Sequence, residues 1–287
     1  MDDPAKKLKP AFRRRLQRVL LAAVAGYLLL CLGCAVWQRT LIYVPPHFTP
    51  EHVDQAAQSA GLERWRDPAG QAIGMQRRSP VQPATGRVLV VYGNGSWTVG
   101  CAHYAEDLQR VAPVDVFLLE YPGYADRAGA PSQAHLFQAA EAALALLPPA
   151  TNQPLYVLGE SLGTGVAAYL AGTHPGRIAG LILLSPYNRL TGVAQHRMPF
   201  LPAGLLLVDR FPAEDYLQSY HGPVGILLDG RDDVVPERFG QRLFDGYAGP
   251  KRLWRNAEGG HISPPQPRAK FWREVMEFWQ ATPAAKN

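Results

Sequence analysis

The chain has 287 residues, of which 47% are hydrophobic and 18% are charged, so it has enough apolar residues to bury a substantial core. Its 27 Gly and 26 Pro are scattered without a period, which excludes a collagen-like chain. The net charge of +5 is local: residues 1–18 hold seven of the 29 Lys and Arg and two of the 24 Asp and Glu, leaving 22 of each elsewhere. This neutral body disfavours a nucleic-acid partner.

The first predicted element is an apolar, uncharged run from Val19 to Trp37, directly after the basic segment. At about 1.5 Å per residue a helix of this length reaches roughly 28 Å, close to the thickness of the hydrocarbon layer. We therefore predict a transmembrane anchor over residues 19–37. The run is longer than the apolar part of a usual cleaved signal peptide, and no A-x-A site follows it. Lipid attachment at Cys34 is a competing interpretation, but Cys31 stands where such a site normally carries Leu.

Charge around the run predicts its orientation. Seven basic residues precede it and Arg39 follows it, and basic flanks of a first span stay in the cytoplasm. We expect a single-pass protein of the inner (plasma) membrane with a cytoplasmic tail (1–18) and a periplasmic or otherwise extracytoplasmic domain (38–287). Cys101 is the only cysteine beyond the run, so that domain has no intramolecular disulfide. Without a visible base nearby, Cys101 is interpreted as a structural thiol.

The remaining elements predict an α/β fold. Thr49 and Pro50 begin a short helix that ends at Gly61, and alternating runs at 62–66 and 72–78 predict a hairpin. Five apolar runs of strand length follow: Val88–Tyr92, Val114–Tyr121, Leu155–Leu158, Ile178–Leu184 and Val224–Leu228. Helical stretches accompany them: Tyr104–Val111, Ser132–Leu147, Ser161–His174 and Glu237–Asp245. This alternation predicts a mostly parallel, doubly wound sheet with its ligand-binding loops after the strands.

The third of these strands runs directly into Gly159-Glu160-Ser161-Leu162-Gly163, and an Ala-rich helix follows. A G-x-S-x-G between strand and helix is typical of a nucleophile elbow, in which small residues permit a sharp turn that exposes the serine. We predict Ser161 as the nucleophile. The turn places backbone N–H groups at a helix N-terminus, so the N–H of Leu162 is a predicted oxyanion donor.

A serine hydroxyl needs a base, and the base needs an orienting acid. In an α/β hydrolase the chain order is serine, acid, histidine, which favours His261 in the segment AEGGHISPP as the base. The other histidines lie before the candidate acids: His47, His52, His103, His135, His174, His196 and His221. The strand ending in DGRDDVVP offers three acids, of which Asp229 comes too early, still at the strand's end. Asp232 and Asp233 both remain open.

The loop after the first apolar strand carries Gly93, Asn94 and Gly95, and the backbone N–H of Asn94 is the predicted second oxyanion donor. A dinucleotide loop is disfavoured because no G-x-G-x-x-G pattern continues there. The sequence has no HExxH, no Cys/His cluster and no P-loop, so we expect no metal and no cofactor.

With these residues identified, the sequence resembles the membrane-anchored α/β-hydrolase-domain serine hydrolases, relatives of the prolyl oligopeptidase and serine aminopeptidase clan. The segments that carry the resemblance are WQRTLIYVP, VVYGNG, LLEYPGY, GESLGTG, LLSPYNRL, DRFPAEDYL, GRDDVVP and GGH. The resemblance implies a triad of Ser161, Asp232 and His261, since the acid in related sequences usually precedes the proline by four positions. Tyr92 and Glu160 depart from the usual pattern of HGN and Arg.

The expected activity is that of a membrane-tethered serine hydrolase cleaving esters or thioesters of a small-molecule or lipid acyl substrate. A peptidase is not excluded, and an acyltransferase or a catalytically silent binding protein on the same fold are the alternatives. Residues 186–222 form a cap-like excursion that contains the apolar run Met198–Val208. That run is either a lipid-facing lid or a helix packed in the core, and apolar helical runs are more often core.

Overall fold

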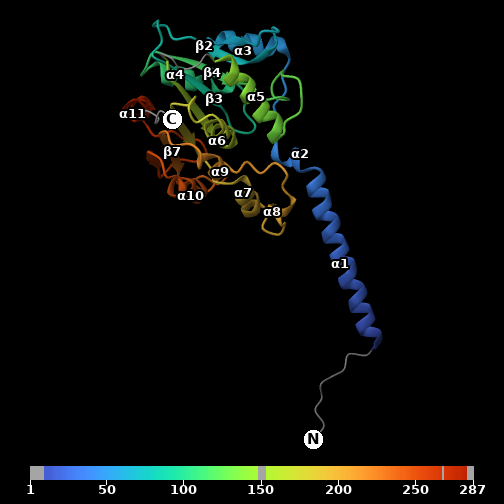
Figure 1. Cartoon of the computed structure of the whole chain (residues 1–287). Helices are drawn as coiled ribbons and strands as arrows, with labels where there is room; N and C mark the ends of the chain where they lie inside the picture. Colours follow the sequence, from blue (N-terminus) through green and yellow to red (C-terminus); the bar gives the residue numbers. More distant parts are fainter. Residues whose placement is uncertain (1–9, 148–152, 267, 283–287) are drawn as a thin grey trace.

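The computed structural model describes residues 10–147, 153–266 and 268–282, and Figure 1 shows a globular domain with one long helix projecting from it. That helix, α1 (Pro10–Val36), is followed by the short α2 (Gln38–Ile42). Within α1 the stretch Phe12–Val36 is long and apolar enough to cross a bilayer, and nearly all its side chains are exposed. A signal sequence near an N-terminus has the same properties. The helix begins before the predicted run, so the arginines at 13–18 are helical too.

The domain is built on one eight-stranded sheet, which confirms the predicted fold class. Its order is β1-β2-β4-β3-β5-β6-β7-β8; β2 pairs antiparallel with β1 and β4, and the remaining pairs are parallel. The strands are β1 (Glu63–Arg66), β2 (Ala72–Arg77), β3 (Gly86–Val91), β4 (Val114–Leu119), β5 (Leu155–Glu160), β6 (Gly180–Leu184), β7 (Val224–Asp229) and β8 (Lys251–Asn256). The predicted hairpin is therefore β1–β2, and strands β3–β7 are buried along their length, as their unbroken apolar runs require.

Helices cover both faces of the sheet. They are α3 (Pro50–Ser59), α4 (Ala102–Gln109) after a 3₁₀ turn η1 (Val99–Cys101), α5 (Gln133–Leu146), α6 (Gly163–Thr173), α10 (Glu237–Gly246) and α11 (Arg268–Ala281). On β5, Tyr156 stacks on Trp279 of α11, with 4.3 Å between ring centroids. Gly159 of the same strand lies against Ala167 of α6. Because side chains alternate along a strand, α11 and α6 lie on opposite faces.

The C-terminal helix α11 completes the core on its face. Trp272 and Trp279 are fully buried, and Trp254 on β8 is buried with 9% exposure. The Trp279 indole N–H donates to the Leu181 carbonyl (3.0 Å), and the Trp272 N–H donates to Asp107 on α4 (3.3 Å). These indole groups attach α11 both to the sheet and to α4.

Three short helices form the excursion between β6 and β7: α7 (Leu190–Arg197), α8 (Ala203–Leu206) and α9 (Ala213–Leu217). The composition of the apolar run 198–208 favoured a helix packed in the core, but the run is only partly buried. Leu201 and Leu207 are buried, whereas Leu205 is 82% exposed and Val208 67% exposed. The run divides because α8 is only one turn long, so successive leucines point to opposite sides.

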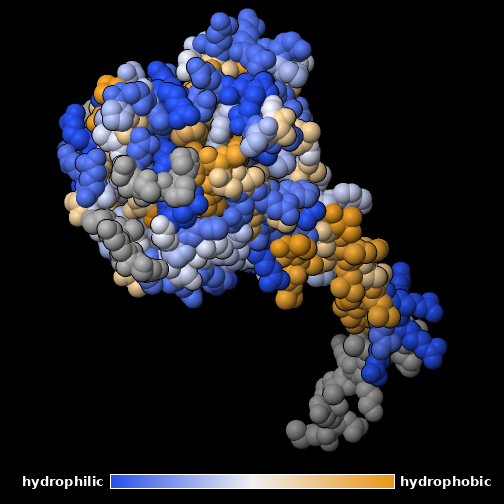
Figure 2. Space-filling view, turned by 45° about the horizontal axis from the view of Figure 1, so that its top comes forward, coloured by the Kyte–Doolittle hydropathy of each residue, from blue (hydrophilic) through white to orange (hydrophobic). Residues whose placement is uncertain are grey.

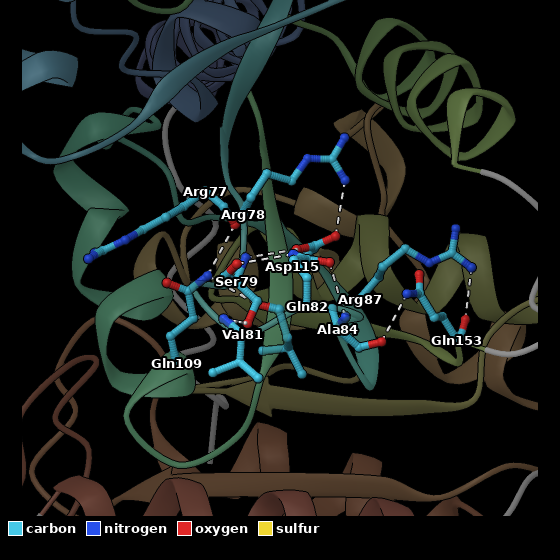
Figure 3. Close-up of polar contacts among 11 residues, drawn as sticks. Arg77, Arg78, Ser79, Val81, Gln82, Ala84, Arg87, Gln109, Asp115 and Gln153 are labelled. Carbon is cyan, nitrogen blue, oxygen red and sulfur yellow. Dashed lines mark hydrogen bonds and ion pairs between the residues drawn. The ribbon is translucent and has the colours of Figure 1, made fainter.

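The edge of the sheet at the N-terminal ends of β3 and β4 is held by a buried aspartate (Figure 3). Asp115 accepts hydrogen bonds from the Ser79 N–H (2.8 Å), Arg78 Nη1 (3.0 Å) and Gln82 Nε2. Figure 3 also shows the Gln153 amide donating to the Ala84 carbonyl, at 2.9 Å. This network fixes the loop between β2 and β3, far along the strands from the edge where Ser161 lies.

Candidate active site

Ser161 occupies a strained turn between β5 and α6. Its φ is +48°, in the left-handed region that is costly for a residue with a side chain. The flanking glycines make the turn possible: a Cβ at Gly163 would lie 2.0 Å from the Val91 carbonyl oxygen, and one at Gly159 would lie 2.8 Å from Ala167 Cβ. The predicted strand, turn and helix are thus present, and the two glycines are required by close packing.

A series of hydrogen bonds joins the three residues predicted as a triad. His261 Nε2 lies 3.0 Å from Ser161 Oγ, and His261 Nδ1 lies 2.7 Å from Asp232 Oδ2. Asp232 is buried, and its Oδ1 accepts from the backbone N–H groups of Val234 (2.9 Å) and Val235 (2.7 Å). Asp233 is exposed on the same loop. Of the two acids left open by the sequence, the structure therefore brings only Asp232 to His261.

The loop that carries His261 is held by Asp229, which the sequence analysis rejected as the orienting acid. Asp229, at the end of β7, accepts hydrogen bonds from Ser185 Oγ (2.9 Å) and from the Ser263 N–H (3.2 Å). Ser185 in turn accepts from the Ile262 N–H at 3.0 Å. Burial raises the pKa of Asp229. Gly259 serves close approach, because a Cβ there would lie 2.4 Å from Asp229 Oδ1.

The backbone N–H groups of Leu162 and Asn94, the predicted oxyanion donors, belong to residues that border the same cavity as Ser161. Within the described ranges neither N–H has a hydrogen-bond partner, so both can receive a ligand oxygen. The neighbouring Gly93 N–H is already used, since it donates to Glu160 Oε1 at 3.1 Å. The Asn94 side chain is also engaged: its Oδ1 accepts from the Val44 N–H (2.9 Å) and from Tyr124 (2.7 Å).

The two departures from the usual sequence pattern are buried structural groups. Glu160 accepts from Tyr104 as well as from Gly93, and burial raises its pKa. Tyr92 donates to Glu120, which also accepts from the Thr98 N–H (3.1 Å) and Thr98 Oγ1 (2.7 Å). Burial raises the pKa of Glu120 to about 6. Together these carboxylates hold Tyr92 and Gly93, which precede Asn94 in the loop after β3, and no local motif indicates that role.

An apolar cavity of about 450 Å³ opens at Ser161, within the usual range for small-molecule sites. Its walls come from the end of α1, from α2, from the excursion and from the loop after Asp232. The lining residues are Cys34, Gln38, Leu41, Ile42, Asn94, Ser161, Leu162, Tyr187, Leu190, Val193, Ala194, Arg197, Met198, Leu201, Ala203, Leu206, Leu207, Val234 and Val235. Most of these side chains are apolar, which suits an apolar ligand group.

The other chemically active groups do not form a site. Cys101 is buried with its Sγ 3.2 Å from Ser96 Oγ, and burial raises the pKa of the thiol well above its ordinary value. A high thiol pKa disfavours the nucleophilic thiolate, in agreement with the structural interpretation of Cys101. Among the described residues no three His, Cys, Asp or Glu side chains are grouped so that they could hold a metal ion.

The α/β hydrolase fold family matches residues 86–261, which is more than half of the chain and extends from β3 to His261. The chain is an α/β hydrolase. An uncharacterized protein of Mycobacterium tuberculosis (strain H37Rv) is 36% identical over 180 residues, covering 62% of this hydrolase and 63% of that protein. The chain thus matches less than two thirds of that relative's length. The uncharacterized protein YfhR of Escherichia coli O157:H7 is 26% identical over 231 residues, covering 77% and 76% of the two chains.

Solved structures share the fold of this α/β hydrolase at low sequence identity. Est1E from Butyrivibrio proteoclasticus has a TM-score of 0.61 at 16% identity, over 77% of this chain and 99% of that one. An esterase of Pyrococcus furiosus has a TM-score of 0.59 at 14% identity, over 84% and 98% of the two chains. The family match and the shared fold support a hydrolase, and the bond it cleaves is a matter for the site itself.

Proposed function

We propose that this chain is a serine hydrolase that cleaves ester or thioester bonds of apolar acyl substrates through an acyl-enzyme. The observation that carries the proposal is the hydrogen-bonded series from Asp232 through His261 to Ser161 at the end of an apolar cavity. Structural hydrogen-bond networks rarely end on a strained serine that borders a cavity, whereas a nucleophile requires that arrangement.

In the proposed mechanism, Ser161 Oγ attacks the carbonyl carbon of the substrate while His261 Nε2 takes the hydroxyl proton. Asp232 accepts from His261 Nδ1, which holds the ring in the tautomer whose Nε2 is free to act as a base. Because Asp232 Oδ1 already accepts two backbone N–H groups, the carboxylate cannot turn away from the ring. The N–H groups of Leu162 and Asn94 would stabilise the oxyanion of the tetrahedral intermediate.

Collapse of that intermediate breaks the bond to the alcohol or thiol, which leaves with the proton held by His261. The acyl group then remains on Ser161 Oγ. Water attacks this ester in the second half of the cycle, with His261 again as base, and releases the carboxylic acid and the free serine.

A fluorophosphonate activity probe tests the proposal directly, because it labels a serine only when that serine is activated. We expect labelling of the wild type and none of Ser161→Ala, with both proteins folded by circular dichroism. Equal labelling of the two proteins, or of neither, would contradict the proposal. Product analysis in the presence of glycerol then separates hydrolysis, which yields free acid, from acyl transfer to the alcohol.

We also propose that α1 anchors this enzyme in the inner (plasma) membrane as a single span, with the hydrolase domain outside the cytoplasm. Support comes from the exposed apolar surface of α1 and from the basic residues that precede its apolar run 19–37. A C-terminal alkaline phosphatase fusion in a bacterial host should be active, and a C-terminal green fluorescent protein fusion should stay dark. The opposite pair of results would place the domain in the cytoplasm.

A further inference from the structure

The excursion is bound to the junction between α1 and α2, more than 160 positions earlier in the chain. Gln38 is buried at this junction. Its Nε2 donates to the Leu206 carbonyl (3.2 Å), and its Oε1 accepts from the Val208 N–H (2.7 Å). One amide side chain thus satisfies backbone groups on both sides of Leu207. The end of α1 and the α8 turn are therefore held in a fixed relation.

A buried carboxylate strengthens the same contact. Asp209 accepts hydrogen bonds from Tyr43 (2.9 Å) and from Arg39 Nε (3.2 Å), and its side chain is only 4% exposed. The segments QRTLIY and DRFP, which are distant in the sequence, meet through these bonds. Loss of the bonds from Tyr43 and Arg39 would leave the buried Asp209 carboxylate without these partners, so the contact between the two segments is specific.

The cavity at Ser161 lies between these two bound segments. Cys34 at the end of α1 and Leu41 on α2 line one side of it, and Leu201 and Leu206 of the excursion line another. The junction also reaches the oxyanion loop, because the Asn94 side chain donates to the Ile42 carbonyl. The helix that we propose as an anchor is thus a wall of the substrate site as well.

The contact between the excursion and α1 continues far down the helix. Tyr27 donates a hydrogen bond to the Phe200 carbonyl at 2.8 Å. Tyr27 precedes Val36 by nine residues, so this contact lies about 13 Å along α1 from its C-terminal end, inside the apolar run. A helix that spans a bilayer over this run carries the Phe200 backbone below the level of the lipid headgroups.

The side chains near that contact are apolar and exposed. Phe200, Leu205 and Val208, which we name the apolar tip, are 62%, 82% and 67% exposed. Figure 2 shows the hydrophobic surface of the projecting helix with a second hydrophobic patch on the domain beside it. Exposed Leu and Phe at this density are costly in water and favourable at the acyl boundary of a bilayer.

We infer that the apolar tip inserts into the bilayer leaflet nearest the domain, and that the substrate is a bilayer-resident lipid ester with a single acyl chain in the cavity. The chain enters from the leaflet between the end of α1 and the α8 turn, and its ester reaches Ser161 without leaving apolar surroundings. This inference rests on the proposed serine hydrolase and on the proposed membrane anchor.

Insertion of the tip is measured without reference to catalysis. The full chain carrying Leu205→Trp is reconstituted in phosphatidylcholine vesicles whose acyl chains are brominated, and the added emission is compared with the wild type. The matched control is Val81→Trp, because Val81 is 60% exposed but lies on the opposite edge of the sheet (Figure 3). We expect quenching of the added emission to be at least about twofold stronger for Leu205→Trp. Equal quenching of the two variants would overturn the inference.

The route of the substrate is measured with a triple variant, Phe200→Ser, Leu205→Ser and Val208→Ser, against Val81→Ser. On monooleoylglycerol embedded in the vesicles we expect the triple variant to lose about tenfold in kcat/KM, and on soluble p-nitrophenyl butyrate to match the control. Equal losses on both esters would overturn the inference. A butyrate activity that persists in Ser161→Ala would instead refute the proposed function, whatever the quenching shows.

Discussion

Two buried aspartates at opposite edges of the sheet have closely similar surroundings and different consequences. Asp115 and Asp232 each accept a backbone N–H through Oδ1 and a nitrogen of a basic side chain through Oδ2. At the N-terminal edge that side chain is Arg78, whose charge the carboxylate neutralises (Figure 3). At the C-terminal edge it is His261, whose second nitrogen reaches Ser161 beside a cavity.

The difference lies in what the partner can do with a proton. The guanidinium of Arg78 donates hydrogen bonds and has no acceptor atom, so its bond to Asp115 can only hold a loop in place. The imidazole of His261 has a second nitrogen, Nε2, that can accept a proton from Ser161, so its bond to Asp232 can support proton transfer. The carboxylate of Asp115 therefore stabilises the fold, whereas in our proposal the similarly placed carboxylate of Asp232 takes part in catalysis.

The largest expected effect comes from removing the side chain of Ser161 or of His261, the residues that follow Asp232 in the hydrogen-bonded series. Ser161→Ala and His261→Ala should each lower kcat/KM on p-nitrophenyl butyrate by at least about 10³-fold, because the nucleophile or its base is lost. The thermal midpoint should change little, since Ser161 borders the cavity and the His261 side chain is partly exposed. A variant that keeps most of the wild-type turnover would remove its residue from the proposed mechanism.

Exchanging the two aspartates for asparagine breaks the comparison itself. Asp232→Asn should lower kcat by about 10²-fold or more with a nearly unchanged midpoint, because an amide favours the wrong tautomer of His261. Asp115→Asn should keep kcat and lose about 1 kcal/mol of unfolding free energy, measured by urea denaturation. Asp233→Asn is the matched control and should change neither quantity. A larger loss of kcat in Asp233→Asn than in Asp232→Asn would transfer the orienting role.

Asp229 sharpens the comparison, because it acts on His261 only through the loop. Asp229→Ala removes the acceptor of Ser185 Oγ and of the Ser263 N–H, so kcat should fall about tenfold as the imidazole loses its placement. Asp229→Asn keeps an acceptor oxygen and should restore most of the rate. If both variants lost the same activity, Asp229 would have a role other than positioning the loop.

The last prediction concerns pH. Glu120 has a pKa of about 6 in the folded chain against an ordinary 4.5, so folding favours its protonated form. Its stabilising contribution is complete below about pH 4.5 and is lost as the pH rises through about 6, a change of about 2 kcal/mol. Urea denaturation of the wild type from pH 4.5 to 7.5 should show this decline relative to Glu120→Gln. Parallel curves for the two proteins would contradict the assignment.

The sheet and the elbow were predictable because their signals are local. Unbroken Val, Ile and Leu runs identify buried parallel strands, and Gly159 and Gly163 announce the turn at Ser161. The order of serine, acid and histidine selected His261, but the register between Asp232 and Asp233 needed either a family resemblance or coordinates. The side chains of two adjacent residues in a loop point in different directions, and the residue types alone do not indicate which of them points toward His261.

The features that could not be predicted from the sequence depend on contacts between residues far apart in the chain. The helices α2, α8 and α9 are each five residues or fewer, too short for a periodic pattern, and bonds from Gln38 and Asp209 help to hold α2 and the α8 turn in place. The division of the run 198–208 into buried and exposed leucines has the same cause. Likewise the support that Asp229 gives to the His261 loop requires the ends of β6, β7 and β8 to meet in space.

The packing of α11 has a consequence for the order in which the domain is completed. During synthesis β5 and β6 emerge well before Trp279, yet Trp279 covers Tyr156 on β5 and donates a hydrogen bond to the Leu181 carbonyl on β6. Until α11 is in place, the part of that face around Tyr156 and Leu181 lacks its cover and is open to wrong partners. Under our proposal of a membrane anchor, the domain is therefore tethered while nearly all of its remaining described sequence is made, and its core closes only when α11 is in place.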